Sequence, residues 1–152
     1  LGSGITFDYQ GRQVLASPNL KQSEISIIDM ETWKTIKRIP TLGPGFFMRS
    51  HEKTPYAWVD VSMGKDKDAM HLLDKRSLEI AATLRPMPGK TASHVEFDRY
   101  GKYALLSISE LDGALIVYDA ASLEEVKRIP MKKPSGKYNV HNKITRSAGT
   151  SH

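Results

Sequence analysis

The chain repeats one pattern of apolar and polar positions three times. Each copy is an alternating apolar run that ends in an Asp, followed by a Ser or Thr three residues later and then by a second apolar run. The Asp residues are Asp29, Asp74 and Asp119, spaced at intervals of about 45 residues. Period-two alternation predicts β-strands, and Asp and Ser/Thr side chains that hydrogen bond to nearby backbone predict a tight turn. Each copy is therefore expected to form a β-hairpin.

Each hairpin belongs to a longer unit with a constant order of elements. A short segment that ends in a Gly or Pro turn comes first. A strand, a loop, the alternating strand, the Asp turn and a fourth strand follow it. The units cover about residues 5–45, 49–89 and 95–136, and a closing segment covers 137–152. Helical spacing extends over no more than one turn in any of these windows. Four short strands in about 45 residues are typical of a β-propeller blade, so an all-β fold is predicted.

The number of units bears on how the fold closes. Closed propellers typically have about four to eight blades of four antiparallel strands. This chain holds about three such units. We therefore expect either part of a larger propeller or a protomer that completes a ring with other chains, and the first interpretation is favoured.

Composition agrees with a folded, soluble domain. The 152 residues are 39% hydrophobic and 26% charged, as is typical of globular proteins. No apolar run approaches the roughly 20 residues needed to span a bilayer, and no signal peptide precedes the first strand-like stretch. Cys is absent, which excludes disulfides, thiol nucleophiles and a Cys-x-x-Cys-His haem attachment within this chain.

The charge balance is basic, with a net charge of +5. The Lys and Arg residues are scattered, with small clusters at Lys127-Arg128 and Lys132-Lys133. A solvated surface and an anionic ligand or partner are both compatible with this distribution. Aromatic residues do not alternate with the basic ones, so nucleic acid is not an expected partner.

The segments that join one unit to the next are the expected place for function, because they lie around the central channel of a propeller. Each joiner carries a histidine near the same place: His51, His94 and His141. Imidazole can act as a general acid or base, or ligate a metal, near neutral pH. The spacing indicates no metal, since there is no His-x-x-x-His and no local carboxylate cluster. A structural and a functional role remain open for these histidines.

Three other residues that attract attention are expected to be structural. His71 lies inside an alternating strand, which favours a packing role over a catalytic one. Trp33 and Trp58 fit packing between blades better than a ligand cage. The Gly43-Pro44-Gly45 stretch permits close approach of backbone, but no Gly-Lys-Ser/Thr and helix follow it, so it is not a phosphate loop.

The joiners resemble those of a known family. The stretches concerned are residues 43–51, 54–60, 91–97 and 133–140. They are similar to the C-terminal blades of the haem d1-binding eight-bladed propellers, which include the cytochrome cd1-type nitrite reductases and the NirN-like proteins of haem d1 biogenesis. The similarity covers essentially the whole chain and is closer to the NirN-like group. It implies haem d1 or its dihydro precursor as ligand, a periplasmic location and a link to denitrification.

The resemblance also implies roles for individual residues. His51 matches a distal-face histidine that helps to protonate nitrite in the reductases. His94 matches a position that is His in the NirN-like group, which makes it the candidate acid/base for dehydrogenation. Arg49 matches a basic residue beside the distal histidine and could pair with a carboxylate of haem d1. Tyr138 and Asn139 match a segment near the edge of haem d1.

Three functions follow as hypotheses. The first is that the parent protein dehydrogenates dihydro-haem d1, with His94 and His51 managing proton transfer. The second is nitrite reduction with His51 as proton donor. The third is a non-catalytic propeller segment that binds a protein partner. The chain alone would hold at most part of a haem d1 site, so activity is expected only when other blades or chains complete it.

Overall fold

The computed structural model describes residues 1–137, and it confirms the predicted all-β fold. These residues contain twelve strands and no helix. The first sheet comprises β1 (Ile5–Tyr9), β2 (Arg12–Pro18), β3 (Glu24–Asp29) and β4 (Thr35–Pro40). The second comprises β5 (Met48–Arg49), β6 (Tyr56–Asp60), β7 (Met70–Asp74) and β8 (Glu79–Leu84). The third comprises β9 (Ala92–Phe97), β10 (Tyr103–Ile108), β11 (Gly113–Asp119) and β12 (Glu125–Met131).

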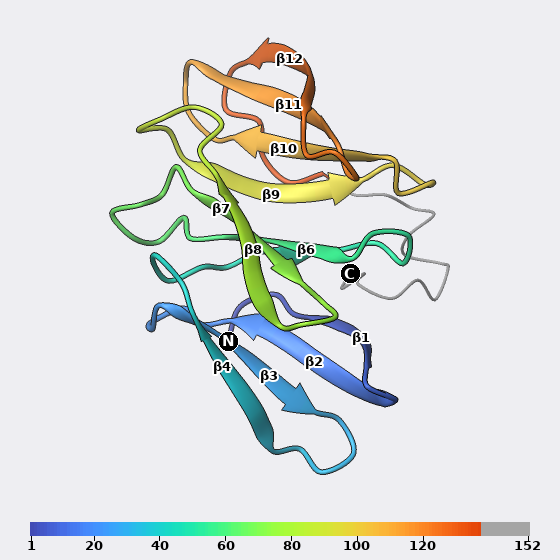
Figure 1. The fold of residues 1–152 in the computed structure, drawn as a ribbon. Coiled ribbons are helices and arrows are strands. Elements are labelled where there is room, and N and C mark those ends of the chain that lie inside the picture. The colour runs from blue at the N-terminus through green and yellow to red at the C-terminus, as the bar shows by residue number, and fades with distance from the viewer. Residues whose placement is uncertain (138–152) are drawn as a thin grey trace.

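Each sheet has the meander order of a propeller blade. Its four strands pair antiparallel with their neighbours in sequence, and the sheets follow one another in the stacking order one, two, three (Figure 1). The third blade starts at Ala92, whereas the sequence pattern placed its start at Val95. This shift matters because it places His94 inside the first strand of the blade instead of in the joiner before it.

The hydrophobic core lies in two clusters, one on each face of the second blade. In β6, Ala57 and Val59 pack toward the first blade, while Trp58 packs toward the third. All three are at most 1% exposed. Because side chains alternate across a strand, a sheet held between two others must be apolar on both faces. Each large side chain buried in this way contributes about 1.5–3 kcal/mol to stability.

The repeated Asp makes the predicted tight turn. Oδ1 of Asp29 accepts hydrogen bonds from the backbone N–H groups of Glu31 (2.8 Å) and Thr32 (2.9 Å), and these bonds lower the pKa of the carboxyl. Asp119 bonds the N–H groups of Ala121 and Ser122 in the same way. The carboxylate thus replaces the ladder bonds that the turn interrupts.

The two tryptophans differ in environment. Trp58 is 1% exposed and packs between the second and third blades, as predicted. Trp33 is 66% exposed, so the expectation that it packs between blades is wrong. Trp33 lies in the turn between β3 and β4, and no blade within residues 1–137 covers it.

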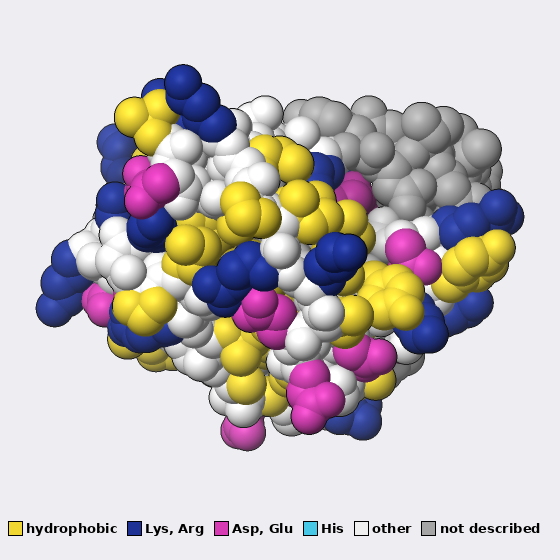
Figure 2. Space-filling view, turned by 90° about the horizontal axis from the view of Figure 1, so that it is seen from above, with side chains coloured by type: hydrophobic (Ala, Val, Ile, Leu, Met, Phe, Trp, Pro, Cys, Tyr) yellow, Lys and Arg dark blue, Asp and Glu magenta, His cyan; other side chains and the backbone are white. Residues whose placement is uncertain are grey.

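The outer face of the third blade is mixed in character. Seen from that side, hydrophobic side chains lie among Lys and Arg side chains and a smaller number of acidic ones (Figure 2). Every residue of β12 is exposed, including Val126, Ile129 and Met131. Arg128 of the predicted basic cluster binds Glu125 of the same strand at 2.7 Å. Within residues 1–137 no helix is long and apolar enough to cross a membrane.

Candidate functional site

The first strands of the second and third blades bring most of the predicted residues into one row. Three contacts join them in order along the strands: Phe47 with His94, Arg49 with Glu96, and His51 with Phe97. The row begins at the joiner end of the sheets and finishes at the opposite end, where the turn between β5 and β6 lies. Its two histidines therefore lie at opposite ends, His94 at the joiner end and His51 at the turn end.

The joiner before β5 is held by a buried carboxylate. Asp60 accepts hydrogen bonds from the N–H groups of Phe46 (2.8 Å) and Phe47 (3.2 Å) and from the hydroxyl of Ser62 (3.0 Å). Burial raises the pKa of Asp60. A Cβ on residue 45 would lie 2.0 Å from the Asp60 carbonyl oxygen, so only Gly45 fits. The joiner consequently presents Phe46, 40% exposed, at the end of the sheets, with Phe47 behind it.

His94 occupies a β-bulge in β9. Its φ of 47° lies in the left-handed region, which non-glycine residues rarely adopt, and the pairing of β9 with β10 shifts between Leu105 and Ser107. A bulge redirects a side chain relative to the regular alternation. The His94 ring is 4% exposed and packs edge-on against Phe47, with ring centroids 4.6 Å apart.

Lys137 holds His94 by both its backbone and its side chain. The Lys137 N–H donates to Nδ1 of His94 at 3.2 Å. Its Nζ donates to the His94 carbonyl oxygen at 2.6 Å and to Oγ of Ser107 at 2.5 Å. Burial lowers the pKa of Lys137 to about 8, and the negative charge of Glu96 acts in the opposite direction. A largely desolvated cation therefore lies beside His94.

Arg49 forms a buried ion pair across the two blades. Its Nη2 lies 2.9 Å from Oε2 of Glu96, and the two side chains are 4% and 5% exposed. Oε1 of Glu96 accepts the N–H of Phe97 at 2.8 Å. The pair ties β5 to β9 in the middle of the row. The role of Arg49 toward a haem d1 carboxylate stays a prediction.

His51 lies at the turn end, buried between the second and third blades. Its Nδ1 accepts the N–H of Lys53 at 3.1 Å, and a Cβ on residue 101 would lie 2.4 Å from that nitrogen, so the ring packs directly on Gly101. Burial is the main cause that lowers its pKa. The sequence pattern suggested that His51 and His94 occupy equivalent positions in their blades. The structure shows that they do not. A role for His51 in proton delivery remains a prediction.

His71 has structural partners on both ring nitrogens. Nε2 accepts the N–H of Leu42 at 3.1 Å, and Nδ1 lies 2.7 Å from Oγ1 of Thr83. The ring thereby links the joiner to β8, in keeping with its predicted packing role. Among residues 1–137 no group of three or more His, Cys, Asp and Glu side chains could hold a metal ion. Tyr138, Asn139 and His141 lie outside the described residues.

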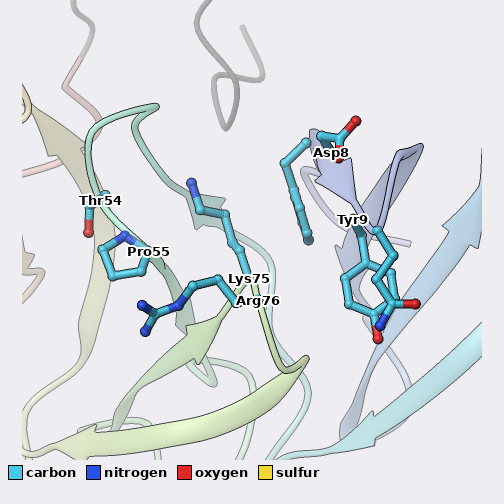
Figure 3. A pocket seen from close by; sticks show the side chains of 8 residues that line it. Asp8, Tyr9, Thr54, Pro55, Lys75 and Arg76 are labelled. Atoms are coloured by element: carbon cyan, nitrogen blue, oxygen red, sulfur yellow. The ribbon is translucent and has the colours of Figure 1, made fainter.

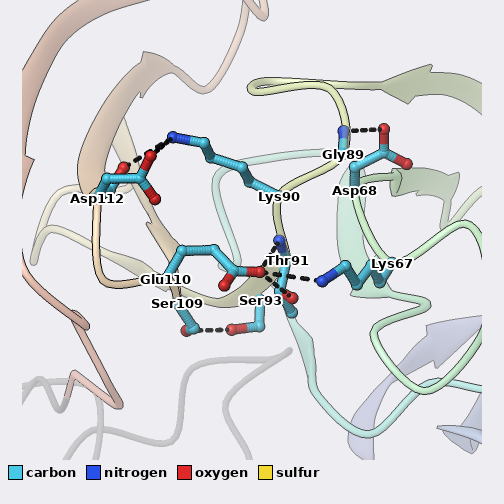
Figure 4. Close-up of polar contacts among 9 residues, drawn as sticks. All are labelled: Lys67, Asp68, Gly89, Lys90, Thr91, Ser93, Ser109, Glu110 and Asp112. Carbon is cyan, nitrogen blue, oxygen red and sulfur yellow. Dashed lines mark hydrogen bonds and ion pairs between the residues drawn. The ribbon is translucent and has the colours of Figure 1, made fainter.

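A polar cluster at the joiner end fixes the start of β9 (Figure 4). Glu110 accepts hydrogen bonds from the N–H (3.0 Å) and hydroxyl (2.8 Å) of Thr91 and from Nζ of Lys67 (3.1 Å). These bonds, led by the one from the Thr91 backbone, lower the pKa of Glu110 to about 2. Beside it, Oγ of Ser93 lies 2.9 Å from Oγ of Ser109. The loops of two blades and the joiner between them are therefore one connected unit.

A separate cleft of about 440 Å³ opens at the turn end, between the first and second blades. Lys75 and Arg76, from the turn after β7, lie between the β1–β2 turn and the Thr54–Pro55 segment (Figure 3). Arg76 is already paired with Asp74 at 2.6 Å, and Nζ of Lys75 donates to the His51 carbonyl oxygen at 3.1 Å. The lining cations therefore have partners within the protein.

Comparison with known proteins decides the family. The model of the "Cytochrome D1 heme domain" matches residues 1–143. The chain belongs to the cytochrome D1 heme domain family.

The relatives of this D1-domain chain are longer proteins. "Dihydro-heme d1 dehydrogenase" of Pseudomonas aeruginosa is 62% identical over the whole chain, which spans 31% of that relative. "Protein NirF" of the same organism is 27% identical over 82% of the chain and 31% of the relative. The solved structure "Dihydro-heme d1 dehydrogenase NirN in complex with DHE" superimposes with a TM-score of 0.92 over 95% of the chain and 31% of that protein. Hydrazine synthase of Kuenenia stuttgartiensis, 18% identical over 78% of the chain and 34% of that chain with a TM-score of 0.70, shares the fold.

Three residues that hold this row and the joiner before it were not singled out from the sequence. They are Asp60, Glu96 and Lys137. Each lies inside or beside a stretch that carries the family resemblance. Their roles depend on partners distant in sequence, such as Arg49 for Glu96 at 47 residues and His94 for Lys137 at 43. The one available signal was for Asp60, an ionisable residue within the apolar run Trp58-Val59-Asp60-Val61.

Proposed function

We propose that this chain forms part of the substrate-binding propeller of a dihydro-haem d1 dehydrogenase that acts in haem d1 biogenesis. The observation that carries the proposal is 62% identity over the whole chain to a protein of that name. The fold agreement with the solved dehydrogenase, at a TM-score of 0.92, supports the same choice. Dehydrogenation is preferred to nitrite reduction because the relative that is 62% identical is named a dihydro-haem d1 dehydrogenase.

The side chains at the joiner end fit a flat, anionic macrocycle. Phe46 and Phe47 offer aromatic faces and edges, and Lys137 places a desolvated positive charge within reach of the same end. Aromatic rings stack on planar ligands, and a cation in a low-dielectric setting pairs strongly with carboxylates. Haem d1 and its dihydro precursor carry several carboxylates. We propose His94, Tyr138 and Asn139 as further contacts of this ligand, whereas Arg49, whose guanidinium is buried against Glu96, is proposed to join the blades.

The proposed reaction removes a pair of hydrogen atoms from the substrate as protons and electrons. The electrons would leave through the macrocycle to a separate electron acceptor. The role of this chain is to bind one edge of the substrate and to hold His94 at a fixed position beside it. We place the protein in the periplasm, where its family resemblance puts haem d1 biogenesis.

The test uses the full-length protein and its His94→Ala variant. We expect the variant to bind dihydro-haem d1 with nearly unchanged spectral shifts, while turnover falls about a hundredfold, the usual effect of losing one polar catalytic group. His71→Ala is the control, because it removes a buried imidazole that bonds Leu42 and Thr83 and is not among the proposed ligand contacts. Full turnover in His94→Ala would show that His94 takes no part in the reaction. The absence of a spectral shift in the wild-type protein would show that dihydro-haem d1 is not its ligand.

A further inference from the structure

The three histidines among residues 1–137 share one feature: a backbone N–H donates to one ring nitrogen of each. Lys137 donates to Nδ1 of His94 at 3.2 Å, Lys53 to Nδ1 of His51 at 3.1 Å, and Leu42 to Nε2 of His71 at 3.1 Å. A backbone N–H can only donate, so the nitrogen that receives it carries no proton. Each ring is therefore set to a single neutral tautomer.

For His94 this tautomer carries its proton on Nε2. A proton on Nδ1 would face the Lys137 N–H, and two donors directed at each other repel. The surrounding charges act in the same direction. The Lys137 ammonium lies on the His94 carbonyl oxygen, while the negative charge of Glu96 on the same strand is already paired with Arg49 from β5. The Lys137 ammonium disfavours a second positive charge close by.

The bulge makes the constraint rigid. His94 adopts its left-handed φ only because the surrounding structure holds it there, and Lys137 bonds both the ring and the peptide of this one residue. Phe47 blocks one side of the ring. Rotation of the imidazole to exchange its nitrogens would break the Lys137 bond and disturb the Phe47 contact.

We propose that Lys137 is a positioning residue that fixes His94 as the neutral Nε2–H tautomer, so that His94 serves the substrate as a hydrogen-bond donor and not as a proton acceptor. This inference rests on the proposed function and specifies it. Its target is an acceptor atom of the macrocycle, such as a carboxylate oxygen. The protons released by dehydrogenation must then be taken up by another group.

The tautomer can be read directly, without turnover. In full-length protein labelled with ¹⁵N-histidine, we expect His94 to show an unprotonated Nδ1 and a protonated Nε2 at neutral pH. Loss of the signals in His94→Gln assigns them. A protonated Nδ1, or an imidazolium at neutral pH, overturns the proposal.

The role of Lys137 is tested with Lys137→Met. Loss of the ammonium frees the His94 carbonyl, so we expect broadened or shifted ring-nitrogen signals and lower turnover. Lys132→Met is the matched control, since Lys132 is an exposed lysine of the same segment, and it should change neither. Unchanged ring nitrogens and turnover in Lys137→Met would show that the Lys137 ammonium does not position His94.

The turnover of the variants His94→Gln and His94→Ala distinguishes a hydrogen-bond donor role of His94 from a proton acceptor role. A Gln amide can donate from near the Nε2 position but cannot accept a proton at neutral pH. We expect turnover about tenfold higher in the Gln variant than in the Ala variant, equivalent to ~1.4 kcal/mol of barrier. Equal loss in both variants contradicts the donor role. Absence of turnover in the wild type instead refutes the proposed function, and leaves the tautomer measurement as the separate test of this inference.

Discussion

At the scale of single residues, His51 and His94 show what sequence reasoning can and cannot reach. The sequence predicted both as unusual, because polar imidazoles recur in joiners. It could not predict that one ring lies in a bulge and the other against a glycine turn, because each environment is built by residues from a different blade. Tautomers in particular follow from ring orientation, which only the folded backbone sets.

The contact between His51 and Gly101 leads to a stability prediction. In Gly101→Ala the new Cβ would lie 2.4 Å from Nδ1 of His51, at a φ of 69° that disfavours any side chain. We expect a loss of about 2–4 kcal/mol, because the methyl group must displace a buried ring as well as adopt strained backbone. Chemical unfolding of the full-length variant measures it.

Gly11→Ala is the control for that experiment. Residue 11 has a similar φ of 78°, but a Cβ there meets nothing within 4 Å. Only the conformational cost remains, about 1 kcal/mol. Equal losses in the two variants would mean that the His51 contact contributes little and that backbone strain explains both.

At the scale of elements, the 45-residue pattern predicted the hairpins and their Asp turns but missed a feature of each turn. The residue four places after each Asp is in the left-handed region: Trp33 at 56°, Leu78 at 55° and Leu123 at 62°. The N–H of that residue donates to the Asp carbonyl oxygen, and the pairing of the two strands shifts by one residue nearby. Glycine is the usual sign of such a position, and none of the three turns has one there.

Trp33→Gly should therefore stabilise the protein. Glycine relieves the left-handed strain of about 1–2 kcal/mol, while its greater freedom in the unfolded chain offsets part of the gain. Trp33 is 66% exposed, so little packing is lost. We expect a net gain of about 0.5–1 kcal/mol in the unfolding free energy. Lys34→Gly, at the next exposed position and without a positive φ, should lower stability instead. A loss in both variants would show that packing of the exposed indole outweighs strain.

At the scale of the whole molecule, the sequence predicted a stack of blades because every repeat needs a neighbour to cover its apolar faces. The second blade meets this condition on both faces, and its strands are accordingly the most apolar. What periodicity could not predict is the polar bonding between blades. The Arg49–Glu96 pair and the Glu110 cluster join residues that share no local pattern, the first in the middle of the row and the second at the joiner end.

The Arg49–Glu96 pair gives a prediction that also tests the role implied for Arg49 by the family. Arg49→Met leaves the Glu96 carboxylate buried without its cation, which should cost about 3–5 kcal/mol of stability. The double variant Arg49→Met/Glu96→Leu removes both charges and should recover most of that loss. Arg76→Met, at a pair with Asp74 in which the Arg is 70% exposed, is the control and should cost less than about 1 kcal/mol.

The same variants separate a structural from a ligand-binding role. If Arg49 serves mainly to join the blades, the double variant regains stability and binds dihydro-haem d1 nearly as well as the wild type. If Arg49 pairs with a carboxylate of the macrocycle, the double variant regains stability but binds the ligand about tenfold or more weakly, the loss expected for one charge-assisted hydrogen bond. Because both side chains are almost fully buried, we expect the first result.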